Sequence, residues 1–154
     1  MAALTHRSDA WSWWNQLGNP QKVLAPMVGA SERAFRMLCR RHGCDLAVTP
    51  MIHARLFGEC DKLRRDVLRD LEGSVEAGDR PLLAQLCGDD KDVLLECARV
   101  CQHYVDGIDL NLGCPQGIAK RGPLRRVSAG GARFGVWYRR ALVFKSKCAR
   151  DLQD

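Results

Sequence analysis

The order of apolar and helical patterns along the chain is the feature that most limits its fold. Short apolar segments are followed by stretches with helical periodicity, and this alternation repeats along the chain. Such an order is typical of β/α units that build a parallel sheet. We therefore predict an α/β fold with strands at residues 22–27, 46–50, 81–87 and 107–112.

The first predicted helix starts after residue 31. Ser31 is suited to be its N-cap, because a serine hydroxyl accepts a hydrogen bond from a free N–H group of the first turn. Gly43 stands where a glycine commonly ends a helix at the C′ position. The predicted apolar face consists of Ala34, Phe35, Leu38 and Cys39.

Two further helices are predicted from the spacing of their apolar residues. In the second helix, Leu63, Val67 and Leu71 recur every fourth residue on a charged background. The third helix begins after Asp89 or Asp90, either of which can cap it. Its predicted buried stripe consists of Val93, Leu94, Cys97, Ala98 and Cys101.

The net charge of +6 is confined to the end of the chain. Residues 1–119 hold 14 basic and 16 acidic side chains, which gives a net charge of −2. Residues 120–154 hold 10 basic and 2 acidic side chains, which gives a net charge of +8. The charge of the main body therefore does not indicate nucleic-acid binding. The break near residue 122 separates the α/β part (22–122) from a basic tail (123–154) that we expect to be poorly ordered, and the residues before the first predicted strand form an N-terminal extension (1–21).

Membrane, secreted and metal-binding classes are not indicated. The longest uncharged apolar run, residues 81–87, is far shorter than the roughly 18 residues of a membrane span. Residues 2–15 do not resemble a secretion signal, so we expect a cytoplasmic and/or nuclear protein. The eight cysteines are expected to be free thiols, and we predict no metal site because C-x2-C and H-x3-H pairs are absent.

The fourth predicted strand carries polar side chains on one face. Asp109 and Asn111 alternate with apolar residues, although a parallel strand buried on both faces is normally apolar throughout. Burying a carboxylate is costly, so these side chains must face hydrogen-bond donors or water. The spacing leaves two interpretations open: an edge strand with a solvated face, or a functional site.

The loops that leave the predicted strands also carry unusual residues. In α/β barrels and open sheets, the loops at the carboxyl ends of the strands build the site. Proline and glycine in such loops allow the backbone to approach a flat ligand closely. The loops in question are residues 25–29, 49–51, 85–88 and 111–115.

Three segments carry a resemblance to a known family. LAPMVGASERAFRMLCRRHG, RPLLAQLCG and DGIDLNLGCPQGIAKRG resemble the tRNA-dihydrouridine synthases, and most closely the eukaryotic members that act at D-loop positions 16 and 17. The similarity runs from about residue 22 to residue 122. GIDLNLGCP joined to QGIAKRG is the specific part of the signature, whereas APM also occurs in other flavin barrels.

The resemblance implies a (β/α)8 barrel that holds FMN, takes electrons from NADPH and reduces the C5=C6 bond of a uridine in tRNA. It implies that the backbone of Pro26, Met27 and Val28 packs against the flavin ring and that Gln85 hydrogen-bonds to it. Cys114 matches the catalytic cysteine. A thiol with a pKa of about 8.5 is protonated at neutral pH and can give a proton to C5 of the uracil.

Three further residues are expected to contact the substrate within the same resemblance. Asn111 is expected to contact the uracil edge or the flavin, because a neutral amide both donates and accepts hydrogen bonds. Lys120 and Arg121 are expected to meet tRNA phosphates. The alternatives are an asparagine that satisfies local backbone groups and a solvated charged loop.

The resemblance stops near residue 122. A (β/α)8 barrel needs about 250 residues, and only four of its eight strands are predicted here. We therefore expect the N-terminal half of the barrel, incomplete, in a truncated product of alternative splicing or a frameshift, which would not retain flavin alone. The alternative function is a non-catalytic fragment that binds RNA or a partner through its basic tail. Another FMN barrel, such as a dihydroorotate dehydrogenase relative, is disfavoured by the GCPQ and IAKRG segments.

Overall fold

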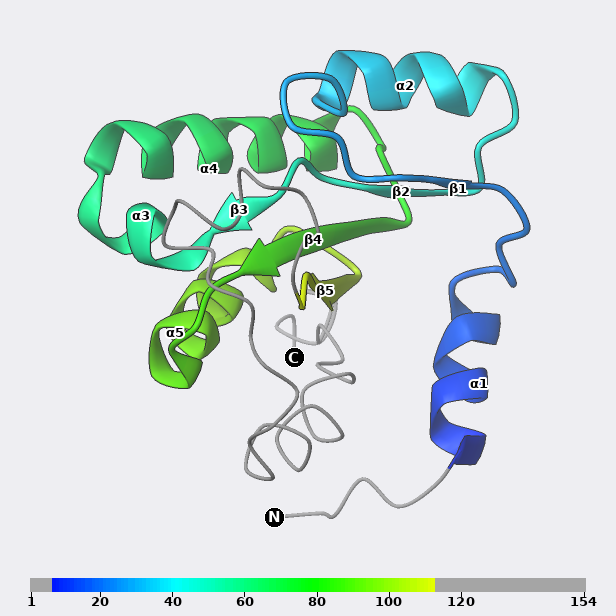
Figure 1. The fold of residues 1–154 in the computed structure, drawn as a ribbon. Helices are drawn as coiled ribbons and strands as arrows, with labels where there is room; N and C mark the ends of the chain where they lie inside the picture. The colour runs from blue at the N-terminus through cyan, green and yellow to red at the C-terminus, as the bar shows by residue number, and fades with distance from the viewer. Residues whose placement is uncertain (1–6, 113–154) are drawn as a thin grey trace, which may run out of the picture.

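The computed structural model describes residues 7–112 of the chain (Figure 1). Cys114, Lys120, Arg121 and the basic tail lie outside these residues. The helices in the described range are all too short or too polar to span a bilayer.

The sheet is parallel at every strand pairing and confirms the predicted fold class. Each strand follows its neighbour as in the first half of a (β/α)8 barrel. The second barrel position is divided, because β2 and β3 both pair with β4 and are separated by residues 49–51. The strands are β1 (Val23–Leu24), β2 (Leu46–Val48), β3 (Ile52–His53), β4 (Leu82–Cys87) and β5 (Gly107–Leu110).

Several predicted boundaries were wrong. The first strand spans two residues rather than the six of 22–27, and the second ends at Val48 rather than at residue 50. The short strand β3 and two of the helices were not predicted. The helices are α1 (Arg7–Gln16), α2 (Arg33–Arg41), α3 (Ala54–Glu59), α4 (Asp61–Glu76) and α5 (Lys91–Cys101).

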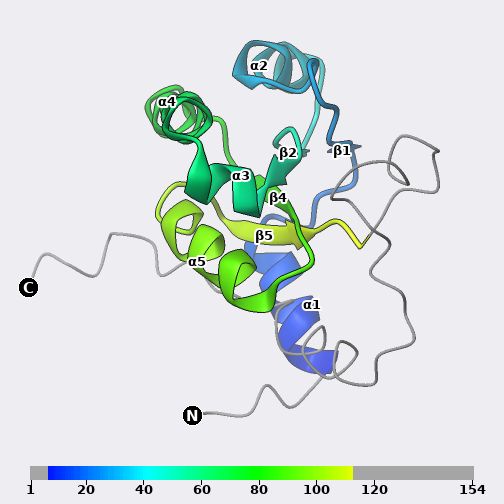
Figure 2. The same ribbon diagram turned by 60° about the vertical axis from the view of Figure 1, so that its left-hand side comes forward.

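The helices fall into two groups (Figure 2). Helices α2, α3, α4 and α5 lie along one side of the curved sheet, whereas α1 lies apart from them near the amino ends of the strands. Trp13 of α1 packs so closely on Gly107 that a Cβ added there would lie 2.7 Å from its ring. Gly107 therefore permits the close approach of α1 to the first residue of β5.

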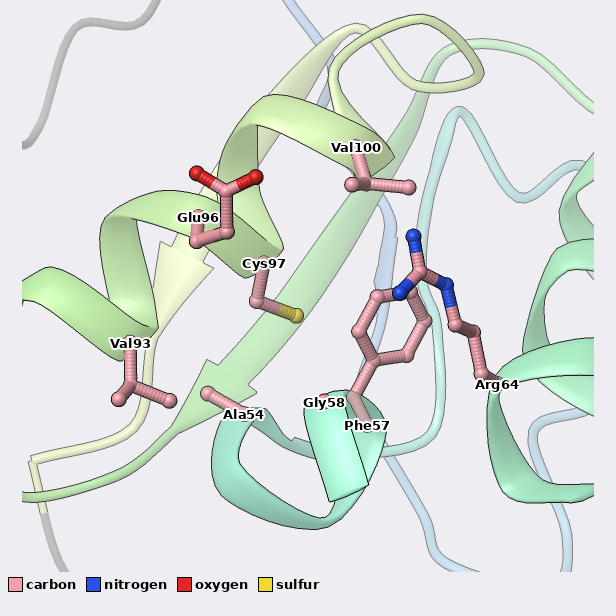
Figure 3. Close-up of a pocket in the computed structure, with 8 residues that line it drawn as sticks. All are labelled: Ala54, Phe57, Gly58, Arg64, Val93, Glu96, Cys97 and Val100. Carbon is pink, nitrogen blue, oxygen red and sulfur yellow. The ribbon is translucent and has the colours of Figure 1, made fainter. Parts of the chain in front are cut away.

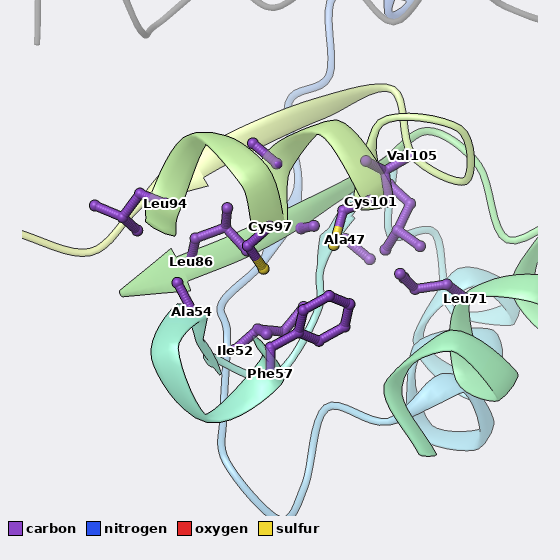
Figure 4. Packing of buried hydrophobic residues seen from close by; sticks show 13 residues of the cluster. Ala47, Ile52, Ala54, Phe57, Leu71, Leu86, Leu94, Cys97, Cys101 and Val105 are labelled. Carbon is purple, nitrogen blue, oxygen red and sulfur yellow. The ribbon is translucent and has the colours of Figure 1, made fainter. Parts of the chain in front are cut away.

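The hydrophobic core lies between the sheet and α3, α4 and α5 (Figure 4). Leu82, Ala84 and Leu86 of β4 point into it, because alternate residues of a strand share one face. Four residues of the predicted α5 stripe, Leu94, Cys97, Ala98 and Cys101, are buried, whereas the fifth, Val93, is partly buried and packs against the core. The helix predicted around Leu63, Val67 and Leu71 is α4, and Leu71 reaches the core.

The predicted apolar face of α2 was wrong. Phe35 and Leu38 are 40% and 48% exposed, and Ala34 and Cys39 are not buried either. The buried residue of this helix is Arg36, which is fully inaccessible to solvent. Apolar spacing cannot reveal this arrangement, because the helix packs through ionic hydrogen bonds rather than through its apolar side chains.

Arg36 is surrounded by acceptors from two other parts of the chain. Its Nε donates to Asp79 Oδ2 at 2.7 Å, and its Nη2 donates to Asp70 Oδ2 and Ser74 Oγ, each at 2.8 Å. Its Nη1 donates to the carbonyl oxygen of Ser31 at 2.6 Å. The guanidinium thus joins α2 to α4 and to the segments before each of β4 and α2.

Arg40 extends the same network. Its Nε donates to Asp79 Oδ1 at 2.6 Å, so the fully buried carboxylate of Asp79 is shared by two guanidinium groups. Its Nη2 donates to the carbonyl oxygen of Pro81, and its Nη1 to that of Asp45. These contacts tie α2 to the residues that precede β2 and β4.

The predicted helix ends are partly confirmed. Gly43 adopts φ +87° as the C′ residue of α2, and Cys44 N–H donates to the carbonyl of Cys39 in the bond that closes such a helix end. Asp90 caps α5, accepting from two backbone N–H groups, and these bonds lower the pKa of its carboxyl. Ser31 is not the N-cap of α2, because that helix starts one residue later with Glu32 at the cap.

We predict that Arg36→Met lowers the free energy of unfolding by roughly 3–5 kcal/mol, because it leaves fully buried Asp79 without one of its two cations and partly buried Asp70 without its cation. Urea titration followed by far-UV circular dichroism measures the loss.

Arg55→Met is the matched control. The ion pair of Arg55 with Asp89 joins side chains that are 47% and 51% exposed, and such a pair contributes at most about 1 kcal/mol. An Arg36→Met variant no less stable than Arg55→Met would show that the buried network does not hold α2.

Candidate active site

The strand register places several polar side chains on the inward face of the sheet. Because Leu82, Ala84 and Leu86 point into the core, Gln85 points to the opposite face. Asp109 is the direct partner of Gln85 on β5, so it shares that face. Asn111 follows Asp109 by two residues and lies just past the carboxyl end of β5.

These three side chains form a chain of hydrogen bonds. Gln85 Nε2 donates to Asp109 Oδ2 at 2.7 Å, and Asn111 Nδ2 lies 3.4 Å from Gln85 Oε1, which accepts from it. Asn111 thus donates to Gln85, and Gln85 in turn donates to the Asp109 carboxylate. The Gln85 amide supplies the fixed donor that Asp109 needs. Within residues 7–112, β5 pairs only with β4 and Asp109 is partly exposed, so both interpretations of this face stay open.

The interruption between β2 and β3 supports the same site. Thr49 Oγ1 accepts from the backbone N–H of Gln85 at 3.2 Å, so a side chain takes the place of a ladder carbonyl at that point. Met51 then reaches across to Asn111, whose Nδ2 lies 3.2 Å from the Met51 sulfur. The proline between them fits this break, because proline gives no backbone N–H to a ladder.

The loop after β1 forms a closed turn. The carbonyl of Met27 accepts from the N–H groups of Ala30 and Ser31, and Gly29 adopts φ +73°, a conformation that favours glycine. Ser31 Oγ both accepts from Met27 N–H at 2.8 Å and donates to Met27 carbonyl at 3.0 Å. Its hydroxyl therefore closes this turn instead of capping α2.

Of the predicted site residues in the described range, Gln85 lies in β4 and Asn111 just past the end of β5, whereas residues 26–28 follow β1, which β2 separates from β4. Gln85 and Asn111 are in direct contact. Pro26 and Met27 are half-buried, and Val28 is 72% exposed at the tip of the turn after β1. The roles of Ser31 and Thr49 were missed, because a serine before a helix resembles a cap and a lone threonine in a strand carries no signal.

A separate cavity of about 210 Å³ lies among α3, α4 and α5 (Figure 3). Among the residues that line the cavity, the Arg64 guanidinium lies over the Phe57 ring, 5.4 Å from the ring centre. The Cys97 thiol points into the same cavity. This cavity lies on the helix side of the sheet, whereas Gln85, Asp109 and Asn111 lie on the opposite side. A hydrogen bond with Cys101 and burial both raise the pKa of the Cys97 thiol, so this cysteine is not an activated nucleophile.

Cys87 is likewise not an activated nucleophile. Burial, with a smaller effect of the neighbouring Cys97, raises the pKa of the Cys87 thiol to about 11. Residues 7–112 form no disulfide and hold no group of three or more potential metal ligands. The predicted catalytic residue Cys114 lies beyond this range.

Comparison with known proteins connects this geometry to a family. The family model described as dihydrouridine synthase matches residues 23–124, which include all the described strands. The chain belongs to the dihydrouridine synthase family. Membership confirms the resemblance inferred from the GIDLNLGCP and APM segments and is consistent with a partial barrel.

Curated members of the dihydrouridine synthase family match over the same region. The tRNA-dihydrouridine(16/17) synthase [NAD(P)(+)] of Schizosaccharomyces pombe is 46% identical over 110 residues, 71% of this chain and 27% of that protein. The protein of the same description in Saccharomyces cerevisiae is 46% identical over 120 residues, which are 78% of this chain and 28% of that protein.

A human tRNA-dihydrouridine(20a/20b) synthase [NAD(P)+]-like protein is 44% identical over 99 residues, 64% of this chain and 30% of its own length. The chain thus spans little more than a quarter of the length of the curated relatives it matches. No solved structure shows a significant match.

We predict that Cys87 and Cys97 resist alkylation in the folded chain, because only the thiolate reacts and the pKa values of both thiols are raised. At pH 8, roughly one Cys87 thiol in a thousand is ionised, since its pKa lies about three units higher. Iodoacetamide labelling followed by peptide mass spectrometry reports each cysteine separately.

Exposed Cys60 serves as the internal control and should label within the same reaction. All three should label once urea unfolds the chain. Labelling of Cys97 at the rate of Cys60 under folding conditions would contradict the conclusion that Cys97 is not an activated nucleophile.

Proposed function

We propose that this chain supplies part of the active site of an FMN-dependent enzyme that reduces uridine to dihydrouridine in tRNA with NADPH. The observation that carries the proposal is the hydrogen-bonded series of Asn111, Gln85 and Asp109 on the inward face of a parallel sheet, at the carboxyl ends of its strands. In α/β barrels this end of the sheet holds the active site.

The residues present fit a flavin. An amide group has two donor hydrogens and two acceptor positions, and the Gln85 bonds to Asp109 and Asn111 use one of each. The other donor and acceptor suit the edge of a flat heterocycle. The resemblance assigns the backbone of the Met27 turn to packing against the ring, and the hydrogen bonds of Ala30 and Ser31 to the Met27 carbonyl give that turn a fixed shape.

Asp109 fixes the orientation of the Gln85 amide. A carboxylate accepts only, so it holds the Nε2 group of Gln85 toward itself and leaves Oε1 toward Asn111. Such preorganisation lowers the cost of ordering these side chains when a ligand binds. Asn111 is the proposed contact to the uracil edge or the flavin.

The proton for the reduction is assigned to Cys114. When bound, reduced FMN would supply a hydride to C6 of the uracil, and C5 must then receive a proton. The Cys114 thiol is the proposed donor to C5, which leaves a thiolate that takes a proton from water. Lys120 and Arg121 are proposed to bind tRNA phosphates and so to place the uridine.

A second candidate function is charge-driven RNA binding, which the net charge of +8 over residues 120–154 favours. Binding of this kind weakens steeply as salt concentration rises. Deletion of residues 123–154 should abolish it, whereas Cys114→Ala should leave it unchanged. Filter binding of tRNA between 50 and 200 mM salt, the range over which such binding falls by orders of magnitude, measures both outcomes.

The proposed reaction is tested in a chimera, because the chain covers about a quarter of its relatives. Residues 23–124 replace the aligned segment of the Saccharomyces cerevisiae relative in a strain that lacks that relative. We expect dihydrouridine to reappear in tRNA, measured by nucleoside mass spectrometry. Cys114→Ala in the chimera should slow the reduction by roughly 10²–10⁴-fold, the effect of losing a general acid.

Gln85→Ala should lower the affinity of the chimera for FMN, and Gln102→Ala, at the end of α5, should not. Retention of full reductase activity by Cys114→Ala would overturn the assignment of the proton donor. A folded chimera that carries flavin but forms no dihydrouridine would overturn the proposed function.

A further inference from the structure

We infer that Ser31 and Arg36 are positioning residues that hold the Met27 turn in the conformation that receives the flavin. This inference rests on the proposed function, because it assigns the turn after β1 to flavin binding. It adds two residues that do not lie at the carboxyl end of a strand and are not expected to touch the ligand.

The first link joins Ser31 to the turn. Both backbone polar groups of Met27 bond to the Ser31 hydroxyl, and the Met27 carbonyl also accepts from Ser31 N–H at 2.9 Å. Ser31 is fully buried, although Val28, three residues earlier, is 72% exposed. The turn is thus anchored at one end by a residue that has no access to water.

The second link joins Ser31 to the body of the fold. Arg36 Nη1 donates to the Ser31 carbonyl at 2.6 Å, while the other nitrogens of Arg36 bond to Asp79, Asp70 and Ser74. Arg36 thus links Ser31 to α4, and the backbone N–H of Arg33 makes a second link to α4 by donating to Asp70 Oδ1 at 3.1 Å. The position of the Met27 backbone therefore depends on the buried guanidinium through a single intervening residue.

The turn needs this support because β1 is short. Only Val23 and Leu24 pair with β2, so the ladder ends before the residues that would meet the ring. Gly29 also lowers the stiffness of the turn, since glycine has the widest range of backbone conformations. Without the Ser31 hydroxyl, the Met27 N–H would exchange its fixed partner for water, and the Met27 carbonyl would keep only its bonds from the backbone N–H groups of Ala30 and Ser31.

Amide hydrogen exchange of the full 154-residue chain tests the inference without flavin. Ser31→Ala removes both side-chain bonds to Met27 and keeps the carbonyl that Arg36 binds. We expect exchange at Met27 and its neighbours in the turn to accelerate by roughly tenfold, the upper range for loss of one net hydrogen bond. Arg36→Lys, which keeps the charge but cannot reach all four acceptors, should have the same local effect.

Ser74→Ala is the matched control. Ser74 is also fully buried and also bonds to Arg36, but its hydroxyl bonds to Asp70 of α4 instead of to the turn. It should reduce global stability without accelerating exchange at Met27 relative to α4. If Ser74→Ala accelerates exchange in the turn as strongly as Ser31→Ala, the effect is general loosening and the inference fails.

FMN titration of the chimera supplies the functional measurement. Ser31→Ala should weaken FMN affinity by roughly tenfold, because the turn must then be ordered on binding, and Ser74→Ala should not. Faster exchange with unchanged FMN affinity would overturn the positioning role. A parent chimera that binds no FMN would overturn the proposed function instead, and the exchange measurements would still decide whether Ser31 and Arg36 order the turn.

Discussion

The buried guanidinium of Arg36 is the constraint on which the arrangement of the first strand depends. Helix α2 presents Phe35 and Leu38 to solvent, so apolar burial does not fix its place on the sheet. Its place is fixed by ionic hydrogen bonds from Arg36 to Asp79 and Asp70. Arg36 and Asp79 are fully buried, and Asp70 is partly buried. Such a cluster is stable only when every charge keeps its partner, which makes its geometry more specific than that of an apolar contact of equal size.

The site depends on register in the same way. Gln85 and Asp109 meet because β4 and β5 pair in parallel with these two residues opposite each other. A shift by one residue would turn one side chain toward the helices and would bury a carboxylate in the apolar core. The break at residues 49–51 then lets Thr49 bond to the Gln85 backbone and Met51 reach Asn111. Three strands thus contribute to one polar group, although no two of its members are neighbours in sequence.

Sequence reasoning predicted the parts of this structure that follow from repeated local patterns. The parallel sheet, most of the buried stripe of α5 and the glycine that ends α2 were confirmed, because periodicity and left-handed backbone geometry are properties of short segments. The packing of α2 was not predicted, since the side chains that Arg36 binds lie 34 to 43 residues away and no local pattern marks them. The contact of Asn111 with Gln85 was also beyond local patterns, although the polar face of β5 and the family resemblance pointed to both residues.

The two arginines of α2 show why one helix can influence both ends of the sheet. Arg40 binds the carbonyls of Asp45 and Pro81, which precede β2 and β4, whereas Arg36 binds that of Ser31, beyond the carboxyl end of β1. Asp79 accepts from both side chains, so their positions are linked through one carboxylate. A displacement of either guanidinium would move a strand start and the Met27 turn together. The polar packing of α2 therefore couples the placement of the strands to the geometry of the loop that meets the ligand, which an apolar helix face, free to slide, would not do.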